Sequence, residues 1–268
     1  MKLSIITPTY NSESTIGRNI LSVLSQTVKD FEHILVDNKS RDNTLRTAEE
    51  LYKKHNIRDK LKVISEKDNG ISDAFNKGIK AAAGDIVAIL NSDDIYYNNQ
   101  VFERVLSAFQ NPEILFVHGD IYFDDPVYGS NIRKPLLCPV TSAMPYNHPT
   151  MFFRKNVYEQ FGLFDTSFKY AMDHELIIRY EKLIRNFGEK GRYLNGESVG
   201  IMYAGGASWQ NELKAVKESR RALKMHGFWN YDARKNYLLR VSRIRIKEYL
   251  NKMNLNVLVK IWRKGKWG

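Results

Sequence analysis

The stretch Ile86-Val87-Ala88-Ile89-Leu90-Asn91-Ser92-Asp93-Asp94 joins five consecutive apolar residues to a polar end with two adjacent carboxylates. A short apolar run with β-branched residues is typical of a strand that is buried on both faces. Such strands form parallel sheets, whose ligands bind beyond the carboxyl ends of the strands. We therefore predict a buried strand over residues 86–90 that delivers Asp93 and Asp94 to a binding edge.

The adjacent carboxylates of Asp93 and Asp94 allow two interpretations. No basic residue lies within seven positions on either side, so the two charges repel each other. A bound Mg²⁺ or Mn²⁺ would relieve this repulsion and would in turn hold a diphosphate. The alternative is a solvated acidic turn that caps the next helix, because Asp is common in turns and at N-caps.

The residues before this stretch repeat the pattern of a strand followed by a helix. Strands are predicted over residues 3–7, 32–36 and 61–65, and helices over residues 13–26, 44–55 and 71–83. This alternation predicts an α/β fold with a mostly parallel central sheet covered by helices on both faces. Polar residues follow the four strands, so we expect these to meet at one edge: residues 7–11, Asp37, Asp68, and Asp93 with Asp94. No glycine-rich phosphate loop occurs, so a nucleotide bound there would need a metal ion to hold its phosphates.

The second half of the chain is less regular, because five prolines lie between residues 126 and 149. Its predicted helices cover residues 99–110, 155–161, 173–184, 209–226 and 231–253. Its predicted strands cover residues 116–118, 121–123, 128–134 and 197–203, and residues 147–153 lead into another.

The composition, with 43% hydrophobic and 12% aromatic residues, is that of a globular protein. The single cysteine, Cys138, excludes an intrachain disulfide and favours a reducing compartment. We expect no signal peptide, because a strand begins at once, and no run approaches the roughly 20 apolar residues of a membrane-spanning helix. The sequence thus predicts a soluble or peripherally attached protein.

The net charge of +11 is concentrated near the C-terminus. Residues 231–268 hold 11 Lys or Arg residues and two Asp or Glu residues. Residues 1–230 hold 30 Lys or Arg residues and 28 Asp or Glu residues. The main domain is therefore nearly neutral, which argues against nucleic acid as a partner. Basic, apolar and tryptophan residues mix in the tail, so we expect peripheral membrane contact through residues 231–268. The alternative is a helix packed on the domain with a solvated basic face.

Five motifs, in their order along the chain, resemble those of the family 2 glycosyltransferases with the GT-A fold. They are Ser-Ile-Ile-Thr-Pro-Thr-Tyr-Asn (4–11), Val-Asp-Asn-Lys-Ser-Arg-Asp-Asn-Thr (36–44), Asp-Asn-Gly-Ile-Ser-Asp-Ala-Phe-Asn-Lys-Gly (68–78), Asn-Ser-Asp-Asp (91–94) and Ala-Met-Asp-His-Glu-Leu (171–176). The resemblance runs from about residue 3 to about residue 210. It implies inverting transfer of a hexose or N-acetylhexosamine from a nucleotide-activated donor. Residues 1–100 would then form the nucleotide-sugar half of one GT-A domain, residues 101–228 its acceptor-binding and catalytic half, and residues 229–268 a basic amphipathic helical tail.

The resemblance assigns the donor side residue by residue. Asp94 matches the family's metal ligand, and Asp93 matches the residue that contacts the ribose or the surroundings of the metal, so the implied cofactor is Mn²⁺ or Mg²⁺. Asp37 matches the carboxylate that accepts a hydrogen bond from uracil. This implies a UDP-sugar, because the matching nitrogen of cytosine is an acceptor. The other residues implied to bind the UDP-sugar are Thr7, Pro8, Tyr10, Asp68 and Asn69.

Asp173 matches the family's catalytic base, which takes the proton of the acceptor hydroxyl on the face opposite the leaving diphosphate. Without the resemblance, an N-cap role for Asp173 is the competing interpretation. The resemblance implies that Tyr10 stacks on the nucleotide base. The alternative interpretation is that Tyr10 is a buried aromatic residue of the core. Two residues are assigned to the acceptor side. His148 either contacts the acceptor or the diphosphate, or it is a structural histidine. Asp120 either shapes the acceptor site or shapes only a turn.

Two features depart from the family pattern. Asn91 stands where many relatives have Asp, and its amide still allows metal binding. The Gln-x-x-Arg-Trp motif of the membrane-embedded polysaccharide synthases is absent, which favours addition of a single sugar.

The resemblance implies synthesis of bacterial O-antigen, capsule or exopolysaccharide units on a glycan acceptor, lipid-linked in the favoured interpretation. The enzyme would be cytoplasmic and peripheral at the inner face of the plasma membrane. One alternative is a nucleotidyltransferase of related topology, although residues 8–11 lack the glycine-rich basic loop that this would need. The other is a non-enzymatic basic protein that binds membrane or nucleic acid.

Overall fold

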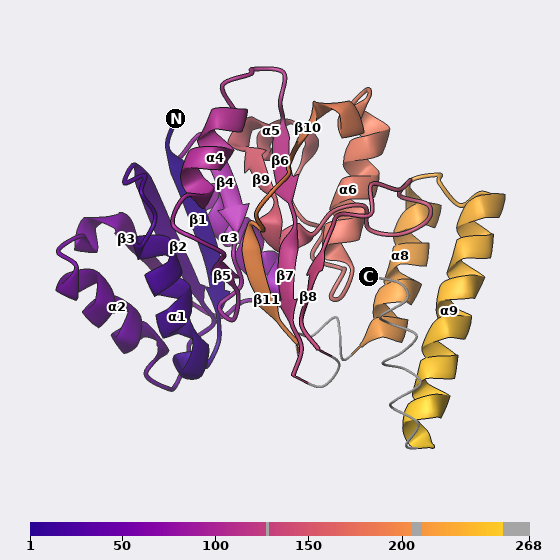
Figure 1. Ribbon diagram of the computed structural model, residues 1–268, viewed down its shortest axis with the longest axis horizontal. Helices are drawn as coiled ribbons and strands as arrows, with labels where there is room; N and C mark the ends of the chain where they lie inside the picture. The colour runs from indigo at the N-terminus through magenta and orange to yellow at the C-terminus, as the bar shows by residue number, and fades with distance from the viewer. Residues whose placement is uncertain (127–128, 205–210, 254–268) are drawn as a thin grey trace.

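The computed structural model describes residues 1–126, 129–204 and 211–253, and in it a central sheet lies between layers of helices (Figure 1). The sheet has seven strands in the order β10-β6-β9-β4-β1-β2-β3. Its strands are β1 (Leu3–Thr9), β2 (Phe31–Asp37), β3 (Leu61–Ser65), β4 (Ile86–Ile89), β6 (Phe116–Gly119), β9 (Phe152–Arg154) and β10 (Gly191–Leu194). Strand β9 runs antiparallel to β4 and β6, and the other pairings are parallel. The predicted α/β fold with a mostly parallel sheet is confirmed.

The stretch that begins at Ile86 is buried on both faces of the sheet, as predicted. Val87 and Ile89 pack into one core, and Ile86, Ala88 and Leu90 pack into the other. Because successive side chains of a strand point to opposite faces, this alternation places one helical layer on each side.

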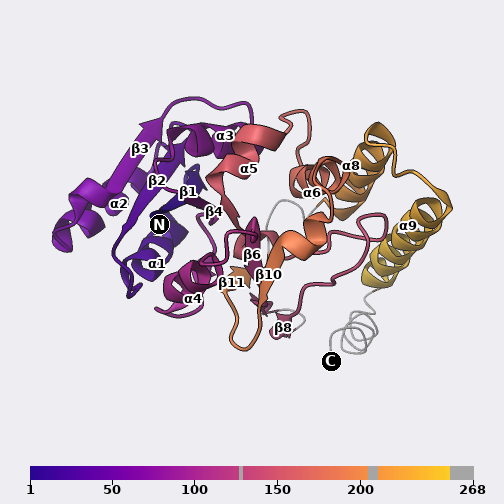
Figure 2. The same ribbon diagram turned by 90° about the horizontal axis from the view of Figure 1, so that it is seen from above.

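One layer consists of α1 (Glu13–Leu24), α2 (Thr44–Lys54) and α4 (Val101–Ala108), and the other of α3 (Ile71–Ala81), α5 (Lys155–Phe161) and α6 (Met172–Leu183). Figure 2 shows α1 and α4 on one side of the sheet and α3 and α5 on the other. Short 3₁₀ turns lie at η1 (Arg58–Lys60), η2 (His148–Thr150) and η3 (Phe187–Lys190).

A second sheet stands beyond the carboxyl ends of the first. It has four strands in the order β5-β11-β7-β8, namely β5 (Ile95–Tyr96), β11 (Gly200–Tyr203), β7 (Ile121–Asp124) and β8 (Asn131–Arg133). Strand β5 follows the Asp93-Asp94 pair directly, and β7 follows β6 after a single residue. The chain therefore passes from one sheet to the other at the edge where the polar strand ends meet.

The C-terminal part described is a pair of helices, α8 (Glu212–Met225) and α9 (Tyr231–Lys252). Ala222, Leu223 and Ala233 join the core that contains α6. Figure 1 shows α8 beside α6, with α9 outermost. Among the described helices, none is both long and apolar enough to cross a membrane.

Several elements differ from the sequence-based predictions. Strands β5 and β10 are not predicted, because β5 has two residues and none of the four side chains of β10 is fully buried. The strand predicted over residues 197–203 begins at Gly200, where its pairing with β7 starts. The predicted helix over residues 209–226 corresponds to α8, and its first two residues, like residues 254–268 of the tail, lie outside the described part.

A buried histidine ties β1, β2 and α2 together. His33 is fully buried, and its ring nitrogens lie 2.9 Å from the Thr7 hydroxyl and 2.7 Å from the Tyr52 hydroxyl. Burial lowers the pKa of His33 to about 3. The imidazole is therefore neutral in the folded protein at any pH well above 3.

This histidine should make stability depend on pH. In the unfolded chain His33 has a pKa near 6.5. Below that pH the unfolded state therefore binds a proton that the folded state does not bind. The free energy of unfolding should fall, through this residue, by about 1.4 kcal/mol per pH unit between pH 6 and pH 4. Urea titrations of wild type and His33→Gln at several pH values measure this. We expect the variant to have the shallower pH dependence, and parallel curves would contradict the assignment.

Candidate functional site

A cavity of about 620 Å³ lies at the carboxyl ends of β1, β2 and β4. The loops after these strands form one wall, and the second sheet contributes another through β7, β8 and β11. The polar residues of its lining are Thr9, Tyr10, Ser12, Asn38, Asp68, Asn91, Ser92, Asp93, Asp94, Arg133, Tyr146, Asn147, His148, Lys169, Asp173 and Tyr203. The predicted convergence of strand ends thus produces a concave site.

The turn that carries the two carboxylates is held by a buried asparagine of α1. The side-chain amide of Asn19, which is fully buried, donates to the backbone oxygens of Asn91 and Asp94, both at 2.9 Å. The Asn91 amide in turn donates to Oδ2 of Asp94 at 3.1 Å. The orientation of the Asp94 carboxyl therefore depends on Asn91.

Two further contacts connect the same turn to its surroundings. The guanidinium of Arg18 donates to the Asp93 backbone oxygen at 3.1 Å and lies 3.8 Å from the ring centroid of Tyr203 on β11. The hydroxyls of Ser12 and Ser92 are 3.0 Å apart. The turn is thereby bound both to the loop after β1 and to the second sheet.

The electrostatics of the pair suit a cation. Asp94 is only 2% exposed, and burial, with a further contribution from the charge of Asp93, raises its pKa to about 8. The Asn91 hydrogen bond and the charge of Arg18 oppose this rise. The Asn91 Oδ1 atom is also buried and has no hydrogen-bond partner among the described residues. Two crowded carboxyls and an unsatisfied oxygen fit a divalent cation, which prefers oxygen ligands.

The protein supplies few ligands for such an ion. No group of three or more His, Cys, Asp or Glu side chains placed to hold a metal occurs in the described ranges. A cation at Asp93 and Asp94 would need the rest of its coordination from water and a ligand. Mg²⁺ is often held in this way, by one or two carboxylates together with phosphates of the substrate.

Asp173 lies in the wall of the same cavity. The N-cap of α6 is Ala171, so Asp173 is inside the first turn and the N-cap interpretation is wrong. Its Oδ1 accepts the backbone N–H of His174 at 2.8 Å. Each carboxylate oxygen can accept more than one hydrogen bond, so this bond leaves the Asp173 carboxylate able to accept another from a ligand.

His148 contributes to the cavity as a neutral ring. Its centroid lies 5.9 Å from that of Phe75 and 6.0 Å from that of Phe164. Burial lowers the pKa of His148, although the nearby charge of Asp173 opposes this shift. His148 therefore combines aromatic packing with a place beside Asp173.

Tyr10 and Asp68 also line the cavity, as does Pro8. Tyr10 is 57% exposed, so the alternative of a buried core aromatic is wrong. The Asp68 carboxylate accepts the Gly70 N–H at 2.9 Å, and the Asp68 N–H donates to the side chain of Asn38 at 3.0 Å. Asp68 is thus fixed against the loop after β2.

Two other predicted donor-side residues are buried beneath the cavity wall. Thr7 is fully buried, and its hydroxyl is engaged by His33. Asp37 is also fully buried, and Oδ2 of its carboxylate accepts from the Ser65 hydroxyl at 2.7 Å and from the Ser40 N–H at 3.1 Å. The structure does not place either side chain among the lining residues.

Asn69 and Asp120 are likewise outside the lining. The backbone of Asn69 is bonded to the Asp73 carboxylate at 3.0 Å, at the start of α3. Asp120 is 4% exposed, and its carboxylate accepts from the Tyr193 hydroxyl at 2.6 Å. This bond joins Asp120 to β10 and leaves it without a contact to the cavity.

Several residues of the site are not predicted from the sequence. Arg133 comes from β8, where its guanidinium lies 3.2 Å from the ring centroid of Phe123, and Lys169 comes from the loop before α6. Both need the second sheet and the tertiary fold to reach the site. Asn19 has a local signal, because it is a polar residue between Ile16, Ile20 and Val23 on the buried side of a helix.

Comparisons with known proteins agree with this arrangement. The family model described as "Glycosyl transferase family 2" matches residues 4–180. A curated relative is the UDP-Glc:alpha-D-GlcNAc-diphosphoundecaprenol beta-1,3-glucosyltransferase WfgD of Escherichia coli, 37% identical over 118 residues, or 44% of this chain. The chain covers 45% of that protein's length, and between 37% and 58% of the length of three other curated relatives.

Two solved structures share the fold. TarS of S. aureus, residues 1–349 in complex with UDP, matches with a TM-score of 0.63 and 20% identity, over 84% of this chain and 65% of that one. The mannosyltransferase PcManGT of Pyrobaculum calidifontis, in complex with GDP-Man and Mn²⁺, matches with a TM-score of 0.64 and 14% identity, over 98% of this chain and 82% of that one. Because the family model covers more than half of the chain, this protein belongs to glycosyl transferase family 2.

Proposed function

We propose that this protein is a metal-dependent, inverting glycosyltransferase that moves a hexose or N-acetylhexosamine from a UDP-sugar to a lipid-linked glycan acceptor. The observation that carries the proposal is that the Asp93-Asp94 pair and Asp173 line one and the same cavity. Inverting transfer needs a group that stabilises the leaving diphosphate and a base for the acceptor hydroxyl.

The donor side is formed by the loops after β1, β2 and β4. Tyr10, which is exposed in the cavity wall, offers a ring face for stacking on uracil. Asp37, one residue before Asn38 of the lining, is the proposed acceptor for the uracil N–H. The UDP bound to TarS and the UDP-Glc in the name of WfgD support a uracil nucleotide.

Asp94 is the proposed direct ligand of Mn²⁺ or Mg²⁺, and Asp93 is its partner on the ribose side. A divalent ion bound there would neutralise the charge that builds on the diphosphate as the sugar leaves. Asn91 orients Asp94, and Asn19 holds the turn. The Mn²⁺ in the PcManGT structure supports a metal in this fold.

Asp173 is the proposed base, acting on the acceptor hydroxyl. In inverting chemistry the base and the leaving group lie on opposite faces of the reacting carbon. His148, neutral and beside Asp173, would contact the acceptor as a hydrogen-bonding group. Asp120 remains a minor proposal on this side, because Tyr193 engages its carboxylate.

The C-terminal helices support a membrane-associated acceptor. The side of α9 away from buried Ala233 and Ile244, at about 100° per residue, carries a row of exposed apolar side chains. They are Tyr231, Leu238, Leu239, Ile246, Tyr249 and Met253. Exposed basic residues flank this row at Arg234, Arg245 and Lys252, and exposed Lys235 lies within it. Apolar and basic groups on one side suit an anionic bilayer, so we place the enzyme at the inner face of the plasma membrane.

The metal assignment is tested by Asp94→Asn, which keeps the size of the side chain and removes its charge. We expect Mn²⁺-dependent binding of UDP, measured by calorimetry, to weaken by about 100-fold, with an unchanged circular dichroism spectrum. The same substitution at exposed Asp59 should leave binding unaltered. Full UDP binding by Asp94→Asn would refute the assignment.

The base assignment is tested by Asp173→Asn. Removing a general base should lower kcat by about 10²- to 10⁴-fold and leave the Kd for UDP nearly unchanged. Release of UDP from UDP-glucose, UDP-galactose and UDP-N-acetylglucosamine with Mn²⁺ both identifies the donor and measures kcat. Asp232→Asn, on the exposed start of α9, is the control. Wild-type turnover by Asp173→Asn would remove Asp173 from the mechanism.

Membrane contact is tested by replacing Leu238 and Tyr249 with Glu. Loss of two apolar side chains from the exposed row should reduce sedimentation with phosphatidylglycerol vesicles by about 10-fold or more. The same change at Leu183, which is exposed at the end of α6, should have no effect. Equal sedimentation of all three proteins would argue against the proposed membrane surface.

A further inference from the structure

The segment that leads to Asp173 is held by α8, a helix that lies outside the residues matched by the family model. Four side chains of α8 and its C-cap reach residues 165–175, which contain the loop before α6 and its first turn. They are Glu218, Ser219, Arg221 and His226. We name residues 165–175 the base segment.

Glu218 makes the most concentrated of these contacts. Its carboxylate accepts hydrogen bonds from three consecutive backbone N–H groups: Lys169 at 3.0 and 3.1 Å, Tyr170 at 2.8 Å and Ala171 at 3.0 Å. The N-cap residue Ala171 has no side-chain acceptor of its own. Glu218 therefore holds the backbone that leads into α6, including the N–H of the N-cap residue, and its charge is favourable at the N-terminus of α6.

Ser219 fixes the chain on the other side of Asp173. Its hydroxyl lies 3.0 Å from Nδ1 of His174, and Nε2 of the same ring lies 3.0 Å from the Val140 carbonyl. His174 is 3% exposed. Asp173 thus sits between two anchored stretches, residues 169–171 and His174.

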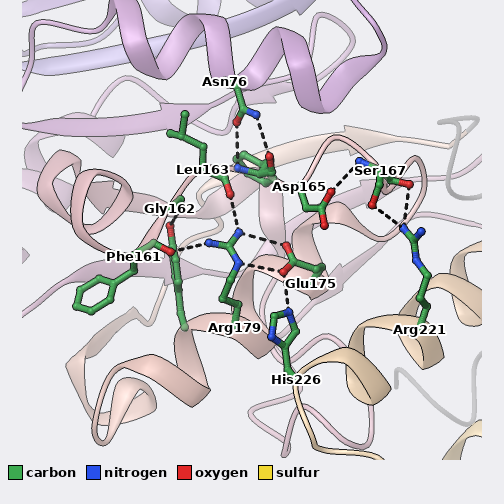
Figure 3. A network of polar contacts seen from close by, with 12 residues as sticks. Asn76, Phe161, Gly162, Leu163, Asp165, Ser167, Glu175, Arg179, Arg221 and His226 are labelled. Carbon is green, nitrogen blue, oxygen red and sulfur yellow. Dashed lines mark hydrogen bonds and ion pairs between the residues drawn. The ribbon is translucent and has the colours of Figure 1, made fainter.

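The outer parts of the base segment are bound in the same manner. Arg221 donates to the Ser167 carbonyl at 2.8 Å, and its guanidinium lies 3.7 Å from the ring centroid of Phe168. At the other end, His226 lies 2.8 Å from the Glu175 carboxylate, which also pairs with Arg179 at 3.0 Å. Figure 3 shows both connections, with Arg221 and His226 reaching the loop and α6 from α8.

We propose that Glu218 is a positioning residue that sets the place of the Asp173 carboxylate in the cavity. This inference rests on the proposed role of Asp173 as base. Without Glu218, three adjacent donors lose their acceptor at once, and the backbone two residues before Asp173 is free to shift. A displacement of about 1 Å of a reacting group costs about 100-fold in rate, so a residue without contact to the substrate can control turnover.

Hydrogen exchange tests the contact itself. In Glu218→Ala we expect the amides of Lys169, Tyr170 and Ala171 to exchange about 10-fold faster or more, because they lose their acceptor. The effect should be confined to the base segment and its partners on α8. Unchanged exchange of the three amides, or faster exchange over the whole chain, would overturn the proposal.

Kinetics separate positioning from stability. With the best of the three UDP-sugars above, Glu218→Ala should lower kcat by about 10- to 100-fold and change the Kd for UDP by less than about two-fold. Glu218→Gln keeps one acceptor oxygen for the three N–H groups and should lose less turnover than Glu218→Ala. Glu159→Gln, which removes an exposed carboxylate on α5, should match wild type. Loss of UDP binding together with turnover would show a general structural role and would reject the proposal.

A double-mutant cycle asks whether Glu218 acts through Asp173. In the Asp173→Asn background, Glu218→Ala should lower kcat by less than about two-fold, because the group that it positions is already gone. An undiminished 10- to 100-fold loss would refute positioning of Asp173. Wild-type turnover by Asp173→Asn would instead contradict the proposed base, and a kcat unaffected by Glu218→Ala would contradict the positioning role alone.

Discussion

The burial of two adjacent carboxyl groups at the end of a central strand is the constraint on which the site depends. Asp94 is nearly inaccessible, and Asp93 precedes it directly. Such an arrangement is unfavourable unless the backbone around it is held firmly and a cation shares the space. The buried amide of Asn19 holds the backbone by bonding two carbonyls of the turn. The turn that carries Asp93 and Asp94 is therefore held by a residue 72 positions before Asn91 in the chain.

Much of the part of the site that comes from residues 1–100 could be predicted from the sequence because its signals are local. The alternation around Ile86 specifies a buried strand. Polar residues that follow parallel strands meet at one edge of the sheet, whatever the conformation of the loops that connect the strands. Asp68, Asp93 and Asp94 reached the cavity for this reason. Local signals do not show which way a side chain turns after the strand ends. Thr7 and Asp37 turn inward to His33 and Ser65, and no periodicity of β1 or β2 indicates this.

The part of the site that comes from residues 101–228 was less predictable because its elements are short and are stabilised by contacts distant in sequence. Strand β10 forms next to β6, about 75 residues earlier, and its side chains carry little hydrophobic signal. Arg133 and Lys169 enter the cavity from a three-residue strand and a loop. Asp173 was predictable through its motif, but the residues that hold it come from α8, and no pattern in residues 171–176 indicates a partner more than 40 positions away.

The charges of the cavity wall bear on how a nucleotide would enter. Four carboxyl groups line it, at Asp68, Asp93, Asp94 and Asp173, with Arg133 and Lys169 as the basic side chains of the described lining. Burial lowers the pKa of His148 and raises that of Asp94 to about 8, so before a cation binds the negative charge of the wall comes from Asp68, Asp93 and Asp173. On the proposed function, the field of such a wall opposes a bare diphosphate and favours one that has already lost most of its charge to a cation. Electrostatics would then impose an order of arrival, in which metal ion and nucleotide enter together or the ion enters first.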